Sequence, residues 1–190
     1  MKPVYGVGVN DSTYHVTRKL PDGEWRCPFY KTWKNMLARC YSQSYLKQCP
    51  ARLGSSVHPD WLSFMSFRSW MVCQDWEGNI LDKDLLVPGN MNYGPDTCLF
   101  VTPQVNTFVS NRKSRGVYPN GSGWRAVASM FNSQSVTIVK SKTYRNREDA
   151  EDEFRKMYSS SLESLAYIQK NPKVAEALLI LSENPNSPKI

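Results

Sequence analysis

The chain has 190 residues, of which 41% are hydrophobic and 22% are charged, a composition typical of a folded globular protein rather than a disordered one. No apolar run approaches the roughly 18 residues that a membrane-spanning helix needs, which argues against a transmembrane protein. The first residues lack the apolar segment of a secretory signal. Five cysteines without a C-x-x-C pair favour reduced thiols over a disulfide framework or a zinc site. We therefore expect a cytoplasmic protein with no membrane partner.

The formal net charge of +7 is concentrated in one part of the sequence. Eight basic residues and no acidic residue lie from Asn111 to Arg147, whereas the rest of the chain holds 16 basic and 17 acidic residues. A stretch with a single sign of charge favours a module that binds a polyanion, most often nucleic acid. The alternatives are a solubilising surface, or a patch that faces the acidic run next to it, from Glu148 to Glu153.

The N-terminal third predicts irregular structure followed by two amphipathic helices. Residues 1–27 are rich in turn-forming residues, and Pro21–Gly23 favours a turn. Apolar residues recur at helical spacing from Pro28 to Tyr41 and again from Pro59 to Met71. Five of the six tryptophans lie before residue 77. We interpret them as the core of a small helical subdomain.

A strand, a polar loop, a second strand and a helix are predicted for the middle of the chain. The strands are residues 80–86 and 98–101, and the loop between them is rich in Gly, Asn and Pro. Thr102 and Pro103 have the form of a helix N-cap and a first helical residue, so a helix is expected from there to about Asn111.

The last third predicts a small antiparallel sheet followed by two helices. Its strands are expected at residues 116–118, 124–130 and 135–140, with a turn cluster at 119–123. A long helix is expected to begin after Asn146, which can cap it. A short helix from Pro172 to about residue 181 is followed by a polar tail.

Oxygen-bearing side chains are spaced in the middle segment as a divalent cation site requires. Asp82 and Asp84 share one face of a strand of period two, and Asn106 lies in the first turns of the helix after it. Carboxylate and amide oxygens suit one Mg²⁺ or Mn²⁺ ion. Such an ion can stabilise charge that develops on a phosphodiester. The alternative is that residues 81–84 are an ordinary exposed strand end.

The order of several motifs resembles that of phage HNH-type homing endonucleases, which belong to the ββα-metal nuclease class. The motifs are Trp33-x-x-Met36-x-x-Arg39-Cys40-Tyr41, Trp61-x-x-Phe64-x-x-Phe67, Leu81-Asp82-Lys83-Asp84 and Tyr93-Gly94-Pro95-Asp96-Thr97-Cys98-x-Phe100-Val101-x-x-x-x-Asn106. The next part of the chain looks like the AP2-type DNA-binding domain often appended to them: Arg115-Gly116-Val117, Gly123-Trp124-Arg125-Ala126 and Tyr144-Arg145-Asn146-Arg147-Glu148-Asp149-Ala150. The resemblance covers about residues 28–165.

This resemblance implies an α+β protein built from three parts. Residues 1–111 would form an HNH-like nuclease domain, with a helical N-terminal subdomain and a ββα-metal core. Residues 112–170 would form an AP2-like domain, a three-stranded antiparallel sheet packed on one helix. Residues 171–190 would form a short helix and a polar tail.

The same resemblance assigns roles in catalysis to single residues. Asp82 takes the place of the metal ligand at the end of the first strand, and Asn106 that of a second ligand. Thr97 stands where many members have an Asn that orients the site and braces the loop. Lys83 stands where better-known members have the general-base His, and a lysine with an ordinary pKa near 10.4 is a poor base.

That departure leaves the source of the base open. Either Asp84, a water chain or another side chain activates the nucleophile, or the protein cleaves slowly or not at all. The interpretation of His58 stays divided between a residue that starts the second helix and one that reaches the active site.

The AP2-type pattern implies that alternate side chains of the sheet enter the major groove of DNA. Arg125 is the candidate for a contact with a base edge, because arginine can bind guanine through two hydrogen bonds. Trp124 either stacks on sugar or base edges or packs against the helix of the domain. The expected phosphate contacts within this domain are Lys140, Lys142 and Arg145. Between the two modules, Arg112, Lys113 and Arg115 would follow the backbone.

Two classes of function are compatible with these residues. The first is a DNA endonuclease of the phage HNH homing type that depends on one divalent ion and nicks or cuts double-stranded DNA, in the cytoplasm of a bacterial host. The second is a catalytically impaired DNA-binding or regulatory protein that acts with a host or phage protein partner. RNA binding through the basic sheet is a third, weaker hypothesis, because one aromatic candidate gives little base stacking.

Overall fold

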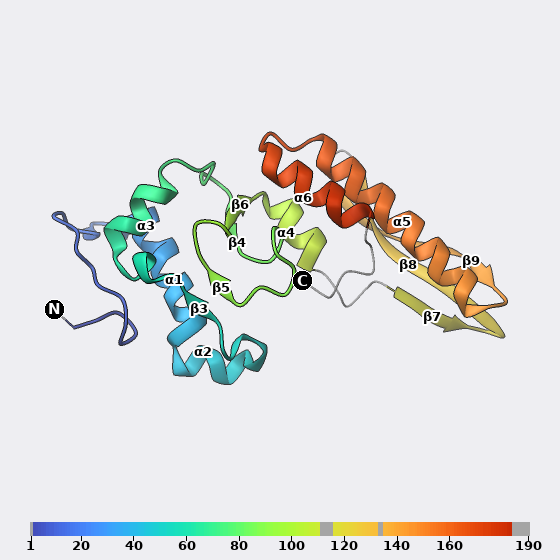
Figure 1. Ribbon diagram of the computed structural model, residues 1–190, viewed down its shortest axis with the longest axis horizontal. Coiled ribbons are helices and arrows are strands. Elements are labelled where there is room, and N and C mark those ends of the chain that lie inside the picture. The colour runs from blue at the N-terminus through green and yellow to red at the C-terminus, as the bar shows by residue number, and fades with distance from the viewer. Residues whose placement is uncertain (1, 111–115, 133–134, 184–190) are drawn as a thin grey trace. The chain divides into compact units, whose positions relative to one another are not determined.

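The computed structural model describes residues 2–110, 116–132 and 135–183 (Figure 1). The chain divides into two compact units, one of Met1–Glu77 with Asn90–Phe100 and one of Gly78–Gly89 with Val101–Ile190. Both helices and small sheets are present, so the predicted α+β class is confirmed. The expected domain boundary at residues 111 and 112 lies outside the described residues. Within the described part of the chain, none of the helices has the length and apolar character needed to cross a membrane.

The helices of the first unit enclose an aromatic core. They are α1 (Pro28–Tyr41), α2 (Gln43–Gln48), η1 (Pro50–Arg52), η2 (Pro59–Leu62) and α3 (Phe64–Met71). Trp33, Trp61 and Phe64 are at most 2% exposed, and the Trp33 indole N–H donates a hydrogen bond to the Trp61 carbonyl at 2.7 Å. These two tryptophans are core residues as predicted, whereas Trp25 is 39% exposed and is not.

Two short helices stand where one was predicted after residue 59. Ser63 between them is extended, and its hydroxyl accepts a hydrogen bond from the backbone N–H of Ser66. Serine is a favourable N-cap because this bond satisfies a donor left free at the start of a helix. The second helix therefore begins at residue 64.

Strands of the first unit occur where irregular structure was expected. β1 (Thr17–Leu20) and β2 (Gly23–Arg26) form an antiparallel hairpin around the predicted turn, and β3 (Ser56–Val57) pairs in parallel with β5 (Asn92–Tyr93). The predictions of irregular structure before residue 28 and of a loop throughout 88–96 are therefore wrong in these places. Both hairpin strands are exposed, so they lack the alternation of buried and exposed residues by which a strand is recognised.

The predicted order of strand, loop, strand and helix is present as β4 (Ile80–Asp82), β6 (Leu99–Val101) and α4 (Pro103–Ser110), with β4 and β6 paired. Strand β4 ends four residues earlier than predicted. The Asp82 carboxylate accepts hydrogen bonds from the backbone N–H groups of Asp84 at 2.9 Å and Leu85 at 2.7 Å, and these bonds turn the chain. Thr102 caps α4 as predicted, accepting a hydrogen bond from the Val105 N–H at 3.3 Å.

The second unit contains the predicted three-stranded antiparallel sheet. Its strands are β7 (Gly116–Asn120), β8 (Gly123–Asn132) and β9 (Ser135–Tyr144), in the order β7-β8-β9. Helix α5 (Arg147–Tyr167) packs along the sheet, and α6 (Pro172–Glu183) packs beside α5 (Figure 1). The two helices were predicted, and Asn146 is the N-cap residue of α5 as expected, although its side chain makes no capping hydrogen bond.

Small side chains allow α5 to approach the sheet closely. Ala126 and Ala128 of β8 and Ala150 of α5 are fully buried. Val127 is the last residue of β8 that pairs with a described residue of β7, and further along the strand the Ser161 hydroxyl of α5 accepts a hydrogen bond from the Phe131 N–H at 3.2 Å. A side chain of the helix thus satisfies a backbone donor at the edge of β8.

Replacing Gly123 with alanine is expected to lower the free energy of unfolding by about 2 kcal/mol, because overpacking beside fixed backbone forces local shifts. A Cβ atom at this position would lie 2.3 Å from the backbone oxygen of Tyr144. Urea unfolding measures the change. The matched control is Gly121→Asn in the same turn, where φ is +61° and nothing lies within 4 Å of the added atom. Asparagine tolerates this conformation, so equal losses in the two variants would contradict the packing argument.

Candidate nucleic-acid interface and metal site

One face of the β7–β9 sheet carries polar side chains from all three strands. Tyr118 of β7 lies directly opposite Arg125 of β8, which lies directly opposite Thr143 of β9. Residues directly opposite in an antiparallel pair project to the same face, and Asn120 shares this face because it is two residues from Tyr118. We call this the open face, and it also includes Lys140 of β9.

Hydrogen bonds hold the Arg125 side chain of the open face in place. The Thr143 hydroxyl accepts one bond from the Arg125 guanidinium at 3.3 Å and one from the Asn120 amide at 2.7 Å. The Nε atom of Arg125 is buried and has no hydrogen-bond partner among the described residues. Arg125 is therefore oriented by Thr143, which engages one of the five N–H donors of the guanidinium.

A β-bulge separates the two lysines of β9. Arg125 pairs with Thr143, whereas Val127 pairs with Lys140, so one residue of β8 faces two of β9. Lys140 consequently projects to the same face as Arg125. The Lys142 ammonium lies 5.2 Å from the centre of the Tyr144 ring, and Tyr144 is directly opposite Trp124 on the other face. Lys140 and Lys142 therefore lie on opposite faces of the sheet, although period two alone would place them together.

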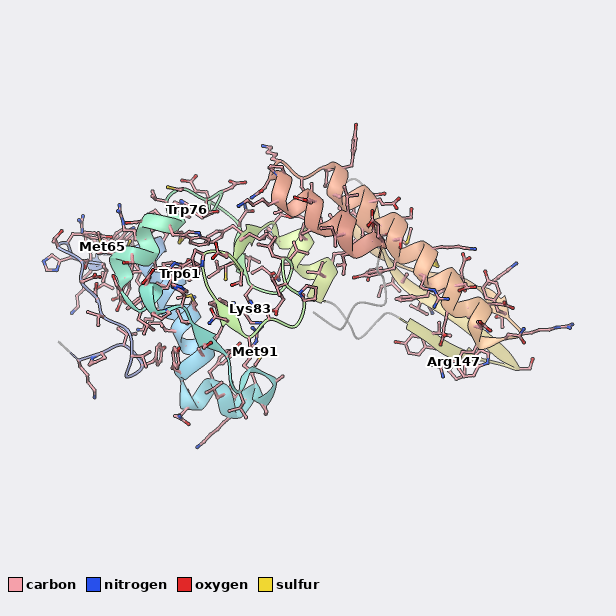
Figure 2. All side chains as sticks on the ribbon, viewed as in Figure 1. Trp61, Met65, Trp76, Lys83, Met91 and Arg147 are labelled. Atoms are coloured by element: carbon pink, nitrogen blue, oxygen red, sulfur yellow. The ribbon has the colours of Figure 1, made fainter. Side chains whose placement is uncertain are left out.

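Trp124 belongs to the face that α5 covers. It has the same parity along β8 as the buried Ala126 and Ala128, and the Arg147 guanidinium of α5 lies 5.4 Å from the centre of its ring. Figure 2 shows Arg147 where α5 begins, beside the sheet. Of the two roles predicted for Trp124, packing against the helix is the one that this contact fits.

Of the remaining basic candidates, only Arg145 lies within the described residues. Arg145 is exposed between β9 and α5. Arg112, Lys113 and Arg115 lie outside the described residues, so their predicted contacts with the DNA backbone stay predictions.

Asp82 stands at the end of β4 with one carboxylate oxygen engaged. Its Oδ1 accepts the two backbone N–H groups that turn the chain, and its Oδ2 makes no hydrogen bond to any described residue. Burial raises the pKa of the Asp82 carboxyl above its ordinary value, although the two backbone hydrogen bonds and the positive charge of Lys83 oppose that rise. The second oxygen is suited to a cation, which would favour the ionised carboxylate.

Lys83 is buried and forms an ion pair with the neighbouring Asp84. The Lys83 side chain is 4% exposed and that of Asp84 is 17% exposed; Figure 2 shows Lys83 within the segment after β4. Charged groups in such surroundings are held together, because separating them would leave a charge without its partner in a region of low dielectric constant. The pair engages Asp84, which was considered as an activator of the nucleophile, and Lys83, which stands at the position of the general base.

Asn106 and Thr97 occupy different parts of the chain. Asn106 lies in α4, which packs against β4, and its half-buried side chain makes no hydrogen bond to described residues. The Thr97 hydroxyl belongs to the first unit, where it donates a hydrogen bond to the Asn92 carbonyl at 2.9 Å and accepts one from the Gly94 N–H at 3.1 Å. Thr97 thus braces its own loop, and its predicted role in orienting the metal site stays a prediction.

The donor set for a metal ion is small. No group of three or more His, Cys, Asp or Glu side chains is placed to hold a metal ion in the part of the chain that the structure describes. Asp82 and Asn106 offer one carboxylate and one amide oxygen. These hard ligands fit Mg²⁺ or Mn²⁺, which commonly keep several water molecules when few protein ligands are present.

His58 occupies the position that precedes η2. Its Nδ1 accepts a hydrogen bond from the Asp60 N–H at 3.3 Å and lies 3.7 Å from the Asp60 carboxylate. Of the two interpretations of His58, this contact fits the residue that starts a helix.

Sequence reasoning missed three members of the open face: Tyr118, Asn120 and Thr143. Tyr118 and Asn120 have the cross-strand partners that an antiparallel pair with a short turn would give them, so pairing the predicted strands residue by residue would have found Tyr118 beside Arg125. The bulge in β9 shifts the register, so the position of Thr143 would not have followed from alternation alone.

No family model, curated protein or solved structure matches this chain. Support for a function therefore comes from the described residues and from the resemblance of the motifs.

Proposed function

We propose that the chain binds double-stranded DNA through the open face of the β7–β9 sheet. The observation that carries the proposal is the separation of side chains between the two faces. Arg125 and Lys140 project from the face opposite α5, and residues 116–144 contain no acidic side chain that would oppose a phosphate backbone. A β-sheet presented by one face fits the major groove, where base edges carry a distinct pattern of donors and acceptors.

The open face contains groups of both kinds that a DNA interface needs. Arg125 is the candidate for a base contact, because its guanidinium is oriented by Thr143 and can donate two parallel hydrogen bonds to guanine. Lys140 is exposed and suits a phosphate. Trp124 and Lys142, on the face of α5, are left out of the proposed interface.

The two lysines of β9 supply a matched test of this interface. Lys140→Gln is expected to weaken duplex binding and to reduce the slope of log K against log salt by about 0.9, the value for one lost phosphate contact. Lys142→Gln removes the same charge from the other face and is expected to leave the slope unchanged. Fluorescence anisotropy over a series of salt concentrations measures both slopes. Equal effects of the two variants would contradict binding through the open face.

A second proposal is that the bound DNA is cleaved, in the manner of a phage HNH-type homing endonuclease. The specific observation in its favour is that Asp82 and Asn106, on packed elements β4 and α4, each have a side-chain oxygen without a hydrogen bond to described residues. These two residues would hold one Mg²⁺ or Mn²⁺ ion. A divalent cation supplies stabilisation of the charge that develops on a phosphodiester during hydrolysis.

The chain's own residues then limit how fast cleavage can be. Lys83 is charged in its ion pair with Asp84 and so cannot take a proton from an attacking water molecule, and Asp84 has one carboxylate oxygen engaged by that pair. Slow cleavage, with a water molecule deprotonated by solvent, fits this arrangement. The alternative is a DNA-binding or regulatory phage protein that has lost turnover and acts with a protein partner. Either protein would act on DNA in the bacterial cytoplasm.

Incubation with supercoiled plasmid separates these two hypotheses. The enzyme is expected to relax or linearise the plasmid with Mg²⁺ or Mn²⁺ and not with EDTA. Binding without any cleavage in either metal would favour the catalytically impaired protein. Failure of the chain to bind duplex DNA at all would overturn both.

A further inference from the structure

A second basic segment belongs to the first unit of the chain. Six basic residues and no acidic residue occur between Glu24 and Asp60. Five of the six are carried by consecutive elements of the structure, namely α1, α2 and η1: Lys31, Lys34, Arg39, Lys47 and Arg52. A surface stretch with one sign of charge is unusual unless it meets the opposite charge. We call these three elements with their five cations the helical basic surface.

Two of these cations converge on one buried phenol. The Arg52 guanidinium of η1 donates a hydrogen bond to the Tyr93 hydroxyl at 3.2 Å, and Arg39 of α1 also hydrogen-bonds the Tyr93 side chain. Tyr93 itself is 1% exposed. Burial raises the pKa of Tyr93, although the charges of Arg39 and Arg52 oppose that rise. The phenol therefore remains neutral near pH 7 and orients both guanidinium groups without cancelling their charge.

The backbone of the first unit fixes this convergence. The Cys40 thiol donates to the Ser56 carbonyl and the Val57 N–H donates to the Tyr41 hydroxyl, so the last turn of α1 is tied to β3. Strand β3 pairs in register with β5, which places Tyr93 directly opposite Val57. Figure 1 shows α2 and β3 beside the end of α1. These backbone contacts thus fix where α1 carries Arg39 relative to the strand that carries Tyr93.

We infer that the helical basic surface is a second DNA contact, with Arg39 and Arg52 forming a phosphate site at Tyr93. Two guanidinium groups held at one point can share a phosphate through parallel charge-assisted hydrogen bonds, for which arginine is better suited than lysine. Lys31 is exposed and lies two turns of α1 before Arg39, on the same side of the helix. It therefore extends the helical basic surface along α1. The inference rests on the proposed binding of duplex DNA. It adds a contact that holds the backbone without reading sequence.

The test compares charge-removing and charge-retaining substitutions in the full chain. The probe is a fluorescently labelled duplex of mixed sequence, and anisotropy gives the affinity over a series of NaCl concentrations. Arg39→Gln and Arg52→Gln are each expected to reduce the slope of log K against log salt by about 0.9. Each is also expected to weaken binding about tenfold, as for the loss of one charge-assisted contact. Arg52→Lys keeps the charge and is expected to keep the slope of the original chain.

Lys173→Gln is the matched control, because Lys173 is an exposed cation of α6 in the other unit. Slopes for the two arginine variants equal to that of the control would overturn the inference. A slope reduced as much in Arg52→Lys as in Arg52→Gln would also overturn it, because the slope would then not report the charge of a phosphate contact. In both cases Lys140→Gln would still test the sheet interface. Absence of duplex binding by the original chain would instead overturn the proposed function and the inference together.

Discussion

Asp82→Asn is expected to reduce metal-dependent plasmid cleavage by at least about a hundredfold, while duplex affinity changes by less than about twofold. The carboxylate that would hold the cation becomes a neutral amide, and the charge stabilisation that a bound metal ion supplies is worth several kcal/mol. The amide oxygen can still accept the backbone N–H groups of Asp84 and Leu85, so the turn after β4 is kept. Rates of supercoiled plasmid loss with Mg²⁺ and with Mn²⁺ measure the effect.

A second substitution at the same position distinguishes the role of Asp82 in the turn after β4 from its proposed role as a metal ligand. Asp82→Ala removes the acceptor of both backbone hydrogen bonds as well as the charge, so it is expected to lower stability where Asp82→Asn does not. Both variants should lose cleavage. Normal cleavage by Asp82→Asn would contradict the proposed role of Asp82 as a metal ligand.

Asp82 should also give the stability of the chain a defined dependence on pH. Burial raises the pKa of this carboxyl in the folded chain, so the unfolded chain loses the proton at lower pH than the folded chain does. At pH values between the ordinary pKa of a carboxyl group and the raised pKa of Asp82, the folded state binds more protons than the unfolded state. The contribution of Asp82 to the free energy of unfolding therefore falls as pH rises through this range. Asparagine does not titrate. The stability of Asp82→Asn relative to the original chain should therefore increase across this pH window and then level off.

Urea unfolding of the two proteins at a series of pH values, without divalent metal, measures this difference. A difference that does not change with pH would mean that the Asp82 carboxyl titrates alike in the folded and unfolded chains. Comparing the two proteins cancels the contributions of the other carboxyl groups, because they are common to both.

Much of the fold can be predicted from local patterns in the sequence. Apolar residues of period 3.6 predict α1, and alternation with clear turn residues predicts β8 and β9. Thr102 and Pro103 mark the start of α4 by the chemistry of the cap itself. In each case the local preference and the packing of the folded chain agree.

The errors arise where the folded chain adds contacts between distant residues. The pairing of β3 with β5 joins residues 36 positions apart, and a local sequence pattern does not predict which strand such a distant partner is. Strand β4 ends early because the Asp82 side chain competes for backbone N–H groups, which alternation does not reveal. The bulge in β9 moves Lys142 away from Lys140, so a count of basic residues in one stretch overstates the charge on one face.

The candidate sites show the same division. Arg125 was identified from its type and strand, whereas its orientation by Asn120 and Thr143 depends on register. Arg39 and Arg52 were absent from the predicted interface, because the net charge outside residues 111–147 is close to zero. Their convergence at Tyr93 depends on the β3–β5 pairing. A scan for acid-free segments, rather than for net charge, would have indicated the second basic surface.

Arg125→Gln is expected to remove the preference of the chain for its best DNA sequence at one base pair. A bidentate contact between arginine and guanine is worth about 1–3 kcal/mol of discrimination, which corresponds to roughly a 5- to 150-fold preference. Glutamine can still accept and donate hydrogen bonds but cannot present the same pair of donors to guanine. Selection from a pool of duplexes with randomised sequence identifies the preferred site for the original chain. The affinity of each protein is then measured for that site and for its single-base variants.

Lys140→Gln is the control that distinguishes reading a base from holding the backbone. It lies on the same face as Arg125 but is placed for a phosphate, so it should weaken binding to every sequence by a similar factor. Loss of discrimination in Arg125→Gln alone would assign sequence recognition to the centre of the open face. Equal losses across all sequences in both variants would assign Arg125 to the backbone, and recognition would then have to come from the shape of the DNA or from another element.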